Sequence, residues 1–332
     1  MVKDVSVIVV TWNGRQWLDG CLGSLRALDP PAAEIIVVDN GSADGTVDYL
    51  RTAYPDVRVV AIDRNLGFAG GNNAGARVAA SRHLAFLNND AQPSPNWLGE
   101  LMSAADATGA GLVTSRIVYM DAPDVLDSAG DGYLRCGGAF KRAHGQRAAP
   151  EPAPVEVFGA CGAAFLIRRD LFEILGGFDE DWFMVYEDVD LSYRARLRGE
   201  RCVLASSAVV RHAGSGSIGH VSASQVFYGQ RNLEWTWLKN SPRSILWRSL
   251  AAHVAYDLAG AIAYGRAGHL LTWLRAKAAA FGGLPGVLRK RRAVQAAATV
   301  DPEVLWAQMD ADWVGIKRRE KAFDFKTGPR HS

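Results

Sequence analysis

The chain has 332 residues, of which 48% are hydrophobic, so it can bury a large core and extended disorder is not expected. The formal net charge of +2 conceals two oppositely charged parts: residues 239–332 carry 16 basic and 7 acidic side chains, net +9, which leaves 21 basic and 28 acidic side chains, net −7, in residues 1–238. The acidic part would repel nucleic acid unless a metal intervened, whereas the basic part can serve nucleic acid or an anionic membrane surface.

The cysteines form no C-x-x-C pair and have no regular spacing, so neither a zinc site nor a disulfide framework is indicated. A reducing, cytoplasmic compartment fits this pattern. The N-terminal run VSVIVV is too short for the hydrophobic region of a signal peptide and is typical of a first strand. We therefore expect a cytoplasmic protein that can also lie on the inner face of the plasma membrane.

Four short runs rich in Val, Ile and Leu, at residues 5–10, 35–38, 57–62 and 84–87, predict strands. The segments between them are long enough for helices, so the alternation predicts a parallel sheet with crossover helices. Ligands of such sheets bind at the carboxyl ends of the strands. The polar residues that follow the strands should form one rim: Thr11 and Asn13, Asp39 and Asn40, Asp63 to Asn65, and Asn88 to Asp90.

Residues 121–156 are rich in Gly, Pro and Ala and hold few long apolar runs, which predicts a mobile loop or insertion. From Pro242 to about residue 280, apolar side chains recur every three or four positions, which predicts a helical region. Asp257 near its middle argues against a transmembrane span. With its flanking basic residues, this region suits an interfacial helix on anionic lipid, and the alternative is a helical subdomain that buries the stripe against the core or a second copy of the chain. The stripe consists of Trp247, Leu250, Val254, Leu258 and Ile262.

Several rim residues have both a structural and a functional interpretation. Asp39 closes the run EIIVVD and can serve a turn and helix cap, or accept a hydrogen bond from a nucleobase or ribose. The stretch RNLGFAGGNNAG lacks the G-x-G-x-x-G of dinucleotide-binding dehydrogenases, but its glycines allow close approach to a sugar-phosphate or simply a turn into a helix. Asp90 at the end of LNND is a candidate ligand for a divalent cation.

Six carboxylates lie within twelve residues of the segment GGFDEDWFMVYEDVDL. Some of them can stabilise a helix N-terminus, but this is more than capping requires, and one that is desolvated among aromatic residues could act as a general base. His212 follows an apolar run, and it is either a structural histidine or a metal ligand that completes a site poor in carboxylates.

In this order, the motifs VSVIVVTWN, VVDNGSADGT, NLGFAGGNNAG, LNND, GGFDE, EDVDL and the later His212 resemble the family-2 inverting glycosyltransferases of GT-A fold. The likeness is greatest to bacterial rhamnosyltransferases and related galactofuranosyl- and polysaccharide-building enzymes, and it covers about residues 4–240. It implies an α/β fold with a GT-A nucleotide-binding sheet in residues 1–240, with a donor half at about 1–115 and an acceptor half at about 116–240. A helical, basic region should follow at 241–332.

The resemblance also implies roles for individual residues. Asp188, the second acid of EDVDL, matches the catalytic base, and Asp90 and His212 would hold Mg²⁺ or Mn²⁺. Because Asn88 replaces the first acid of the family's D-x-D motif, the metal site should be weaker than usual. The residues expected to bind the donor are Thr11, Asn13, Asp39, Asn65, Asn73 and Asn88, and those expected on the acceptor side are Trp182, Glu187, Asp190 and Arg231.

The function that the resemblance implies is inverting transfer of a sugar from a nucleotide-diphospho-sugar to a hydroxyl of a glycan or polyprenyl-diphosphate-linked glycan in cell-surface polysaccharide synthesis. L-rhamnose from dTDP-rhamnose is the preferred donor. A UDP-sugar-dependent enzyme such as a galactofuranosyltransferase is an alternative, as is a catalytically silent sugar-nucleotide-binding subunit. A nucleotidyltransferase is disfavoured, because the glycine- and arginine-rich phosphate loop is absent from VTWNGRQW. The sequence is also compatible with a homo-oligomer, and no nucleic-acid partner is expected.

Overall fold

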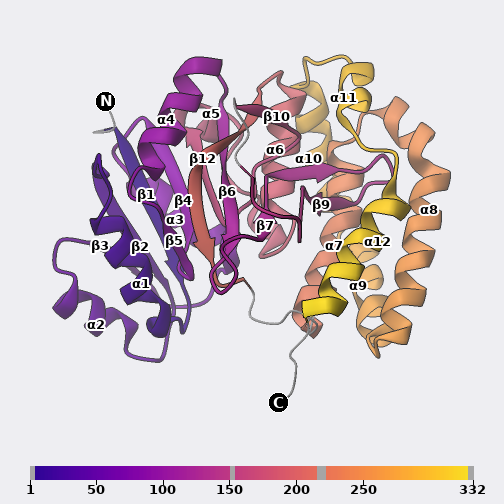
Figure 1. The fold of residues 1–332 in the computed structure, drawn as a ribbon. Coiled ribbons are helices and arrows are strands. Elements are labelled where there is room, and N and C mark those ends of the chain that lie inside the picture. The colour runs from indigo at the N-terminus through magenta and orange to yellow at the C-terminus, as the bar shows by residue number, and fades with distance from the viewer. Residues whose placement is uncertain (1–3, 150–153, 215–221, 328–332) are drawn as a thin grey trace.

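The structure is a computed structural model that describes residues 4–149, 154–214 and 222–327, with the side chains of 321–327 left out. A mixed sheet crosses its centre in the order β10-β12-β6-β11-β4-β1-β2-β3 (Figure 1). The four predicted strands are confirmed and pair in parallel. They are β1 (Val5–Thr11), β2 (Glu34–Asn40), β3 (Arg58–Ile62) and β4 (His83–Asn88).

The second part of the sheet is mixed in direction. β11 (Ala164–Arg168) is antiparallel to both β4 and β6 (Leu112–Tyr119), and β12 (Cys202–His212) runs parallel to β6. The short strand β5 (Ala91–Pro93) pairs with the end of β12. This arrangement brings residues near 90 and near 212 together although they are far apart in the sequence.

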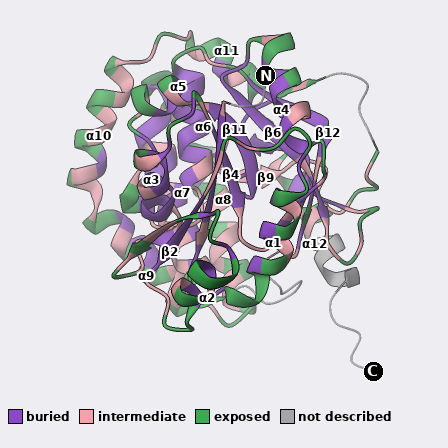
Figure 2. Ribbon diagram, turned by 90° about the vertical axis from the view of Figure 1, so that its left-hand side faces the viewer, coloured by how far each residue is buried: buried purple, intermediate pink, exposed green. Residues whose placement is uncertain are grey.

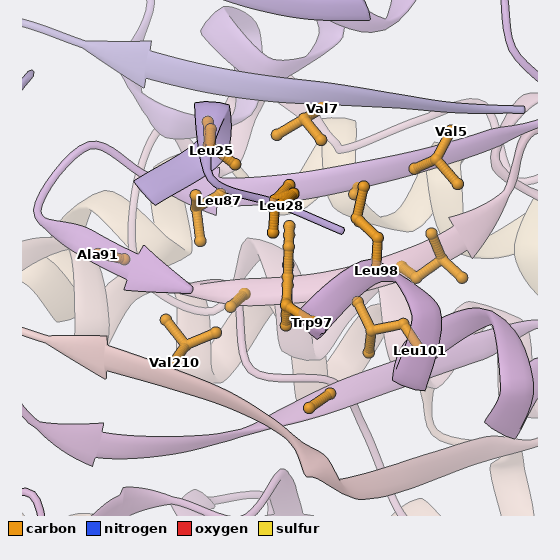
Figure 3. Close-up of a cluster of buried hydrophobic side chains, with 14 of the residues drawn as sticks. Val5, Val7, Leu25, Leu28, Leu87, Ala91, Trp97, Leu98, Leu101 and Val210 are labelled. Carbon is orange, nitrogen blue, oxygen red and sulfur yellow. The ribbon is translucent and has the colours of Figure 1, made fainter. Parts of the chain in front are cut away.

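Helices cover both faces of the sheet, and each interface is a separate apolar cluster. α1 (Arg15–Arg26), α2 (Thr46–Ala53) and α4 (Trp97–Thr108) cover one face, and α3 (Gly67–Val78), α5 (Arg169–Ile174) and α6 (Glu187–Leu197) cover the other. Figure 2 shows the buried sheet between these layers. On the first face, fully buried Trp97 packs among apolar side chains from α1, β1, β4 and α4 (Figure 3), and its indole Nε1 donates to Ser115 Oγ at 2.8 Å.

The prediction of a mobile loop at 121–156 is wrong for the described residues of that segment. It contains β7 (Leu126–Ser128), which pairs with β6, the two-stranded sheet of β8 (Asp131–Tyr133) and β9 (Ala139–Lys141), and the edge strand β10 (Val155–Val157). All residues of β7 and β8 are buried. Three-residue strands separated by glycine turns are too short to show a periodic pattern, so the sequence did not reveal them. Residues 150–153 lie outside the described part.

The C-terminal region is helical, as expected. After α7 (Ala223–Asn240) come α8 (Arg243–Arg266), α9 (Leu270–Gly282), α10 (Leu284–Ala296), α11 (Pro302–Gln308) and α12 (Trp313–Thr327). α7 packs against α9 and α10 as well as against α6. The expected division of the chain at residue 240 coincides with the end of α7, and it stays a prediction. Nowhere in the described residues does a helix combine the length and hydropathy needed to span a membrane.

The apolar stripe of α8 faces solvent. Ile245, Ser249 and His253, on the opposite side of the helix, are buried, whereas the stripe residues are exposed. The alternative in which the stripe is buried against the catalytic core is therefore wrong.

Candidate active site

The predicted rim exists at the carboxyl ends of the first strands. Thr11, the last residue of β1, lies beside Asp39 on β2, and Val10 lies beside Asn88 on β4. The hydroxyl of Thr11 accepts a hydrogen bond from Asn89 Nδ2 at 2.9 Å. Parallel pairing thus brings together three of the segments that the sequence singled out.

Asp39 has one oxygen in a turn and one oxygen without a partner. Its Oδ2 accepts a hydrogen bond from the backbone N–H of Ser42 at 3.1 Å. Its Oδ1 is buried and makes no hydrogen bond to any described residue. An unpaired buried acceptor is costly, so a ligand donor such as an N–H or hydroxyl fits this position.

Two rim asparagines shape the loops around Asp39. Asn13 has a positive φ of 49°, and its Oδ1 accepts from Ala43 N at 2.8 Å, which ties the loop after β1 to the loop after β2. Asn65 Oδ1 accepts from Asn40 Nδ2 at 3.0 Å and from Gly67 N at 2.8 Å. Donor contacts by Asn13 and Asn65 stay predictions.

Asn73 is hydrogen-bonded to the segment that precedes α6. Its Oδ1 accepts from Phe178 N, and its Nδ2 donates to Phe178 O and Glu180 Oε1, all within 3.0 Å. Both polar ends of the amide are therefore occupied in holding the segment before α6. A donor contact by Asn73 stays a prediction.

The predicted metal ligands lie next to each other. His212 ends β12 and pairs with Ala91, so its imidazole reaches Asp90, with Nε2 at 3.2 Å from Asp90 Oδ1 and 3.3 Å from Asn88 Nδ2. Burial disfavours the imidazolium, but the hydrogen bonds to Asp127 and Asp90 raise the pKa of His212 to about 9. A carboxylate oxygen and an imidazole nitrogen at this separation can bind one divalent cation once Nε2 loses its proton. The donor set therefore fits Mg²⁺ or Mn²⁺.

Asp127 is a functional candidate that the sequence did not reveal. Its Oδ2 lies 2.9 Å from His212 Nδ1, and its Oδ1 accepts from Lys141 Nζ at 2.6 Å. Although burial raises the pKa of Asp127, the charges of Lys141 and His212 hold it well below its usual range. A carboxylate on the second nitrogen of a metal-binding histidine fixes the ring and its tautomer. Asp127 and His212 are 85 positions apart, so spacing gave no signal.

The carboxylate of Asp188 is held at the start of α6 by backbone groups. Its Oδ2 accepts from Gly162 N at 2.7 Å and its Oδ1 from Val189 N at 2.8 Å, while the residue stays partly exposed. Burial raises the pKa of Asp188. Ala163, next to Gly162, accepts from Asn88 N at 2.9 Å. The same short loop therefore links Asp188 to the end of β4, where Asn88 precedes Asp90.

Asp188 has two close neighbours that the sequence did not point to. Ligand atoms of Asp131, Cys161 and Asp188 all lie within 4.8 Å of one another. Burial and the charge of Asp188 raise the pKa of Asp131 well above its usual range, so we take Asp131 to be protonated beside an ionised Asp188. Burial also raises the pKa of the Cys161 thiol well above its usual range, so Asp188 is the only charged ligand of the three, and we assign no cation to this group.

A strained segment leads into α6. Phe183, Val185 and Tyr186 have positive φ angles of 62°, 65° and 76°, which is unfavourable for bulky or β-branched residues. Asn232 of α7 is fully buried and stabilises this segment, because its Nδ2 lies within 3.0 Å of the carbonyl oxygens of Trp182, Met184 and Val185. The position of Glu187 and Asp188 thus depends on α7.

Two of the expected acceptor-side residues are buried structural residues. Asp190 has no exposed surface and contacts Lys239 Nζ at 2.7 Å, Arg194 Nε at 2.8 Å and Asn240 Nδ2 at 2.8 Å. Trp182 is also fully buried, and its Nε1 donates to Thr236 Oγ1 at 2.9 Å. The acceptor-side expectation is wrong for both. Two positions along a helix turn a side chain by about 200°, so Asp190 faces away from Asp188.

The other two acceptor-side candidates stay predictions. Glu187 is buried, and its Oε2 has no hydrogen-bond partner among the described residues. Burial and the neighbouring charge of Asp188 raise the pKa of Glu187 well above its usual range. Arg231 on α7 donates to Asp181 O at 2.6 Å and stacks on Trp235 at 4.1 Å, so part of its guanidinium has a structural role.

Known sequences resemble this chain over much of its length. The profile described as glycosyl transferase family 2 matches residues 6–176. The N-acetylglucosaminyl-diphospho-decaprenol L-rhamnosyltransferase of Mycobacterium tuberculosis (strain CDC 1551 / Oshkosh) is 28% identical over 270 residues, which cover 71% of this chain and 87% of the relative. The pre-mycofactocin glycosyltransferase of the same strain is 30% identical over 231 residues, covering 68% of this chain and 46% of the relative.

Solved structures share the fold. A mannosyltransferase from Pyrobaculum calidifontis, in complex with GDP-Man and Mn²⁺, aligns with a TM-score of 0.54 and 19% identity over 96% of this chain and 87% of its own. Residues 1–349 of TarS from S. aureus, in complex with UDP, align with a TM-score of 0.53 and 18% identity over 88% of each chain. The sheet and its flanking helices therefore have the GT-A fold.

Proposed function

The chain belongs to glycosyl transferase family 2 and is a glycosyltransferase, and on this premise we propose that it transfers a sugar from a nucleotide-diphospho-sugar to a glycan hydroxyl with inversion at C1. The observation that carries the proposal is the carboxylate of Asp188, fixed by two backbone N–H groups and linked through residues 162–163 to the strand end beside Asp90 and His212. A base and a cation-binding pair on one rim are what direct displacement at a sugar carbon requires.

In this reaction Asp188 accepts the proton of the acceptor hydroxyl while its oxygen forms a bond to C1 and the bond from C1 to the donor diphosphate breaks. Because the oxygen attacks opposite the leaving group and no second carboxylate acts as a nucleophile, the configuration at C1 inverts. Asp90 and His212 would hold Mg²⁺ or Mn²⁺, which when bound neutralises the negative charge of the departing diphosphate. Asp39 accepts a hydrogen bond from the base or ribose through its unpaired oxygen, beside Thr11 on β1, and Asn88 lies on the far side of β1 on β4.

We further propose L-rhamnose as the transferred sugar and a lipid-linked glycan as the acceptor, because the name of the mycobacterial relative contains L-rhamnosyl transfer and a diphospho-decaprenol acceptor. The proposed donor, dTDP-rhamnose, follows from the resemblance to bacterial rhamnosyltransferases. A UDP-sugar donor, as in galactofuranosyltransferases, is the second candidate. A catalytically silent binding subunit is less favoured, since the residues that we propose as base and metal ligands, Asp188, Asp90 and His212, are all present. Cell-surface polysaccharide synthesis at the cytoplasmic face of the membrane would be the corresponding cellular role.

A panel of nucleotide sugars tests this proposal. We expect release of the nucleoside diphosphate from dTDP-rhamnose, dependent on Mg²⁺ or Mn²⁺ and accelerated by a GlcNAc-diphosphate-lipid acceptor. Turnover of a UDP-sugar alone would replace the donor assignment. Binding of nucleotide sugars without any turnover, with every acceptor offered, would favour the silent subunit.

Asp90→Ala and His212→Ala should each weaken Mn²⁺-dependent binding of a nucleoside diphosphate, and the two losses should not add. The reason is that both side chains act on one cation, so removing the second ligand changes little after the first is gone. Isothermal titration calorimetry of the single and double variants measures this. Additive losses would mean that the two residues act independently and that the shared site does not exist.

Asp127→Asn should lower the affinity for Mn²⁺ by about 10–100-fold, measured by the same calorimetry, while the free energy of nucleotide binding without metal stays unchanged. The amide keeps the shape of the side chain but loses the charge that fixes the tautomer of His212 and pairs with Lys141. Asp124→Asn, at an exposed position of the same segment, is the matched control. Equal Mn²⁺ affinity of both variants would leave Asp127 without a role at the metal.

A further inference from the structure

α8 and α9 expose an unusual amount of apolar surface. The five stripe residues of α8 have exposed fractions between 40% and 68%, and three leucines of α9 are exposed between 45% and 60%. The α8 row runs from Trp247 to Ile262, about 22 Å along the helix axis. Apolar patches of this kind on a soluble chain mark interaction sites. The eight residues, termed the α8–α9 apolar surface, are Trp247, Leu250, Val254, Leu258, Ile262, Leu270, Leu271 and Leu274.

The charge around this surface is positive. Residues 243–296 contain nine Lys and Arg residues and a single acid, Asp257. That acid is neutralised by Lys277, with Nζ and Oδ1 2.5 Å apart. Arg243, Arg266 and Arg275 are exposed and form no ion pair with a described residue. No free carboxylate therefore lies on α8, α9 or α10.

We propose that the α8–α9 apolar surface binds the surface of an anionic lipid bilayer, with α8 lying in the plane of the interface and its arginines on the phosphate groups. Amphipathic helices with Trp and Leu on one face and Arg beside it bind anionic membranes in this way. Figure 1 places α8 at the edge of the molecule farthest from β3 and α2, so docking leaves the sheet uncovered. The inference extends the proposed function, in which the acceptor is lipid-linked.

A second copy of the chain fits this surface less well. In a two-fold dimer both copies contribute the same surface to the interface, so the positive charges of one copy face those of the other. An antiparallel pair of α8 helices centred near Val254 would bring Arg243 of one copy toward Arg266 of the other, and the one acid of α8, Asp257, is already paired with Lys277. Anionic lipid supplies the opposite charge that a second copy lacks.

Co-sedimentation of the full chain with vesicles tests the proposal. We expect binding to phosphatidylcholine vesicles that contain phosphatidylglycerol, weaker binding to pure phosphatidylcholine, and loss of binding at high salt. Trp247→Ser combined with Leu258→Ser should lower the partition coefficient about tenfold or more, because two exposed apolar side chains no longer enter the interface. Ile174→Ser is the matched control, since Ile174 is 58% exposed on α5, away from this surface. The double variant Arg266→Gln and Arg275→Gln should weaken binding to anionic vesicles but not to pure phosphatidylcholine, because it removes positive charge only. Arg51→Gln, at an exposed position of α2, is the control for the loss of an arginine elsewhere.

The result is decided by comparison with these controls. Absence of sedimentation with anionic vesicles at low salt would overturn the proposal, as would equal sedimentation of the Trp247 and Leu258 double variant and the wild type. A wild-type dimer that becomes a monomer in the double variant, measured by light scattering, would assign the surface to a second copy. Transfer to a water-soluble acceptor should be unchanged in all variants. If the wild type itself shows no turnover, that result counts against the proposed function, and the vesicle result is unaffected.

Discussion

Asp188→Asn is expected to lower turnover by about 10²–10⁴-fold while donor affinity stays near the wild-type value. The amide can no longer accept a proton, and its single oxygen can keep only one of the two backbone hydrogen bonds that Asp188 accepts, from Gly162 N or from Val189 N. A loss of this size corresponds to about 3–5 kcal/mol of transition-state stabilisation. Steady-state kinetics with calorimetry of donor binding separates the two effects.

The pH dependence gives a second readout of Asp188. Burial raises its pKa, and only the ionised carboxylate can act as a base, so turnover should fall as the pH is lowered through that raised pKa. This acidic limb should be absent from the residual activity of Asp188→Asn. If Glu187→Gln is inactive and Asp188→Asn is active, the base is Glu187. Asp170→Asn, at an exposed position of α5, controls for the loss of one negative charge.

Lys239→Met should lower the free energy of unfolding by about 3–5 kcal/mol, which is a large part of the stability of a typical domain. Lys239 is 1% exposed and its ammonium lies 2.8 Å from Asp179 Oδ2, 2.7 Å from Asp190 Oδ1 and 3.9 Å from the centre of the Trp182 ring. Methionine fills the volume but leaves the buried carboxylate of Asp190 with less compensation. Urea denaturation followed by circular dichroism measures the loss.

Arg26→Met is the matched control for this prediction. Arg26 also forms an ion pair, with Asp56, but both side chains are 40% or more exposed, so the expected loss is below about 1 kcal/mol. If Lys239→Met lowers the free energy of unfolding no more than Arg26→Met does, the buried contacts of Lys239 do not contribute net stability. Its effect on catalysis should stay small as long as the protein is folded, because Lys239 does not contact Asp188.

The sequence predicted the first half of the fold well because the parallel strands are continuous apolar runs followed by polar residues. The same rule placed Thr11, Asp39 and Asp90 on one rim. The pairing of Asp90 with His212 came from the family resemblance, since the two residues meet only through the pairing of β5 with β12. No local pattern carries that contact.

Predictions failed where residues of one type differ only in the direction they face. Asp188 and Asp190 belong to the same motif, but the helix turns one toward the rim and the other into a buried ion pair. Asp127 was missed because its own segment has no periodic pattern and its partners are far away in the sequence, Lys141 on the short strand β9 and His212 at the end of β12.

The attachment of α7 has a consequence for building chimaeric enzymes. Its carbonyl groups at residues 238–241 accept hydrogen bonds from Arg291 and Gln295 of α10, and its Glu234 binds Lys277 of α9 at 2.6 Å. The same helix carries Asn232, which holds the strained turn before the base. Residues 182–186, α7 and the helices after it should therefore open as one cooperative unit in hydrogen exchange. A splice point between relatives therefore belongs before Trp182, since a junction at residue 222 or 241 would divide this unit and pair native contacts with foreign ones.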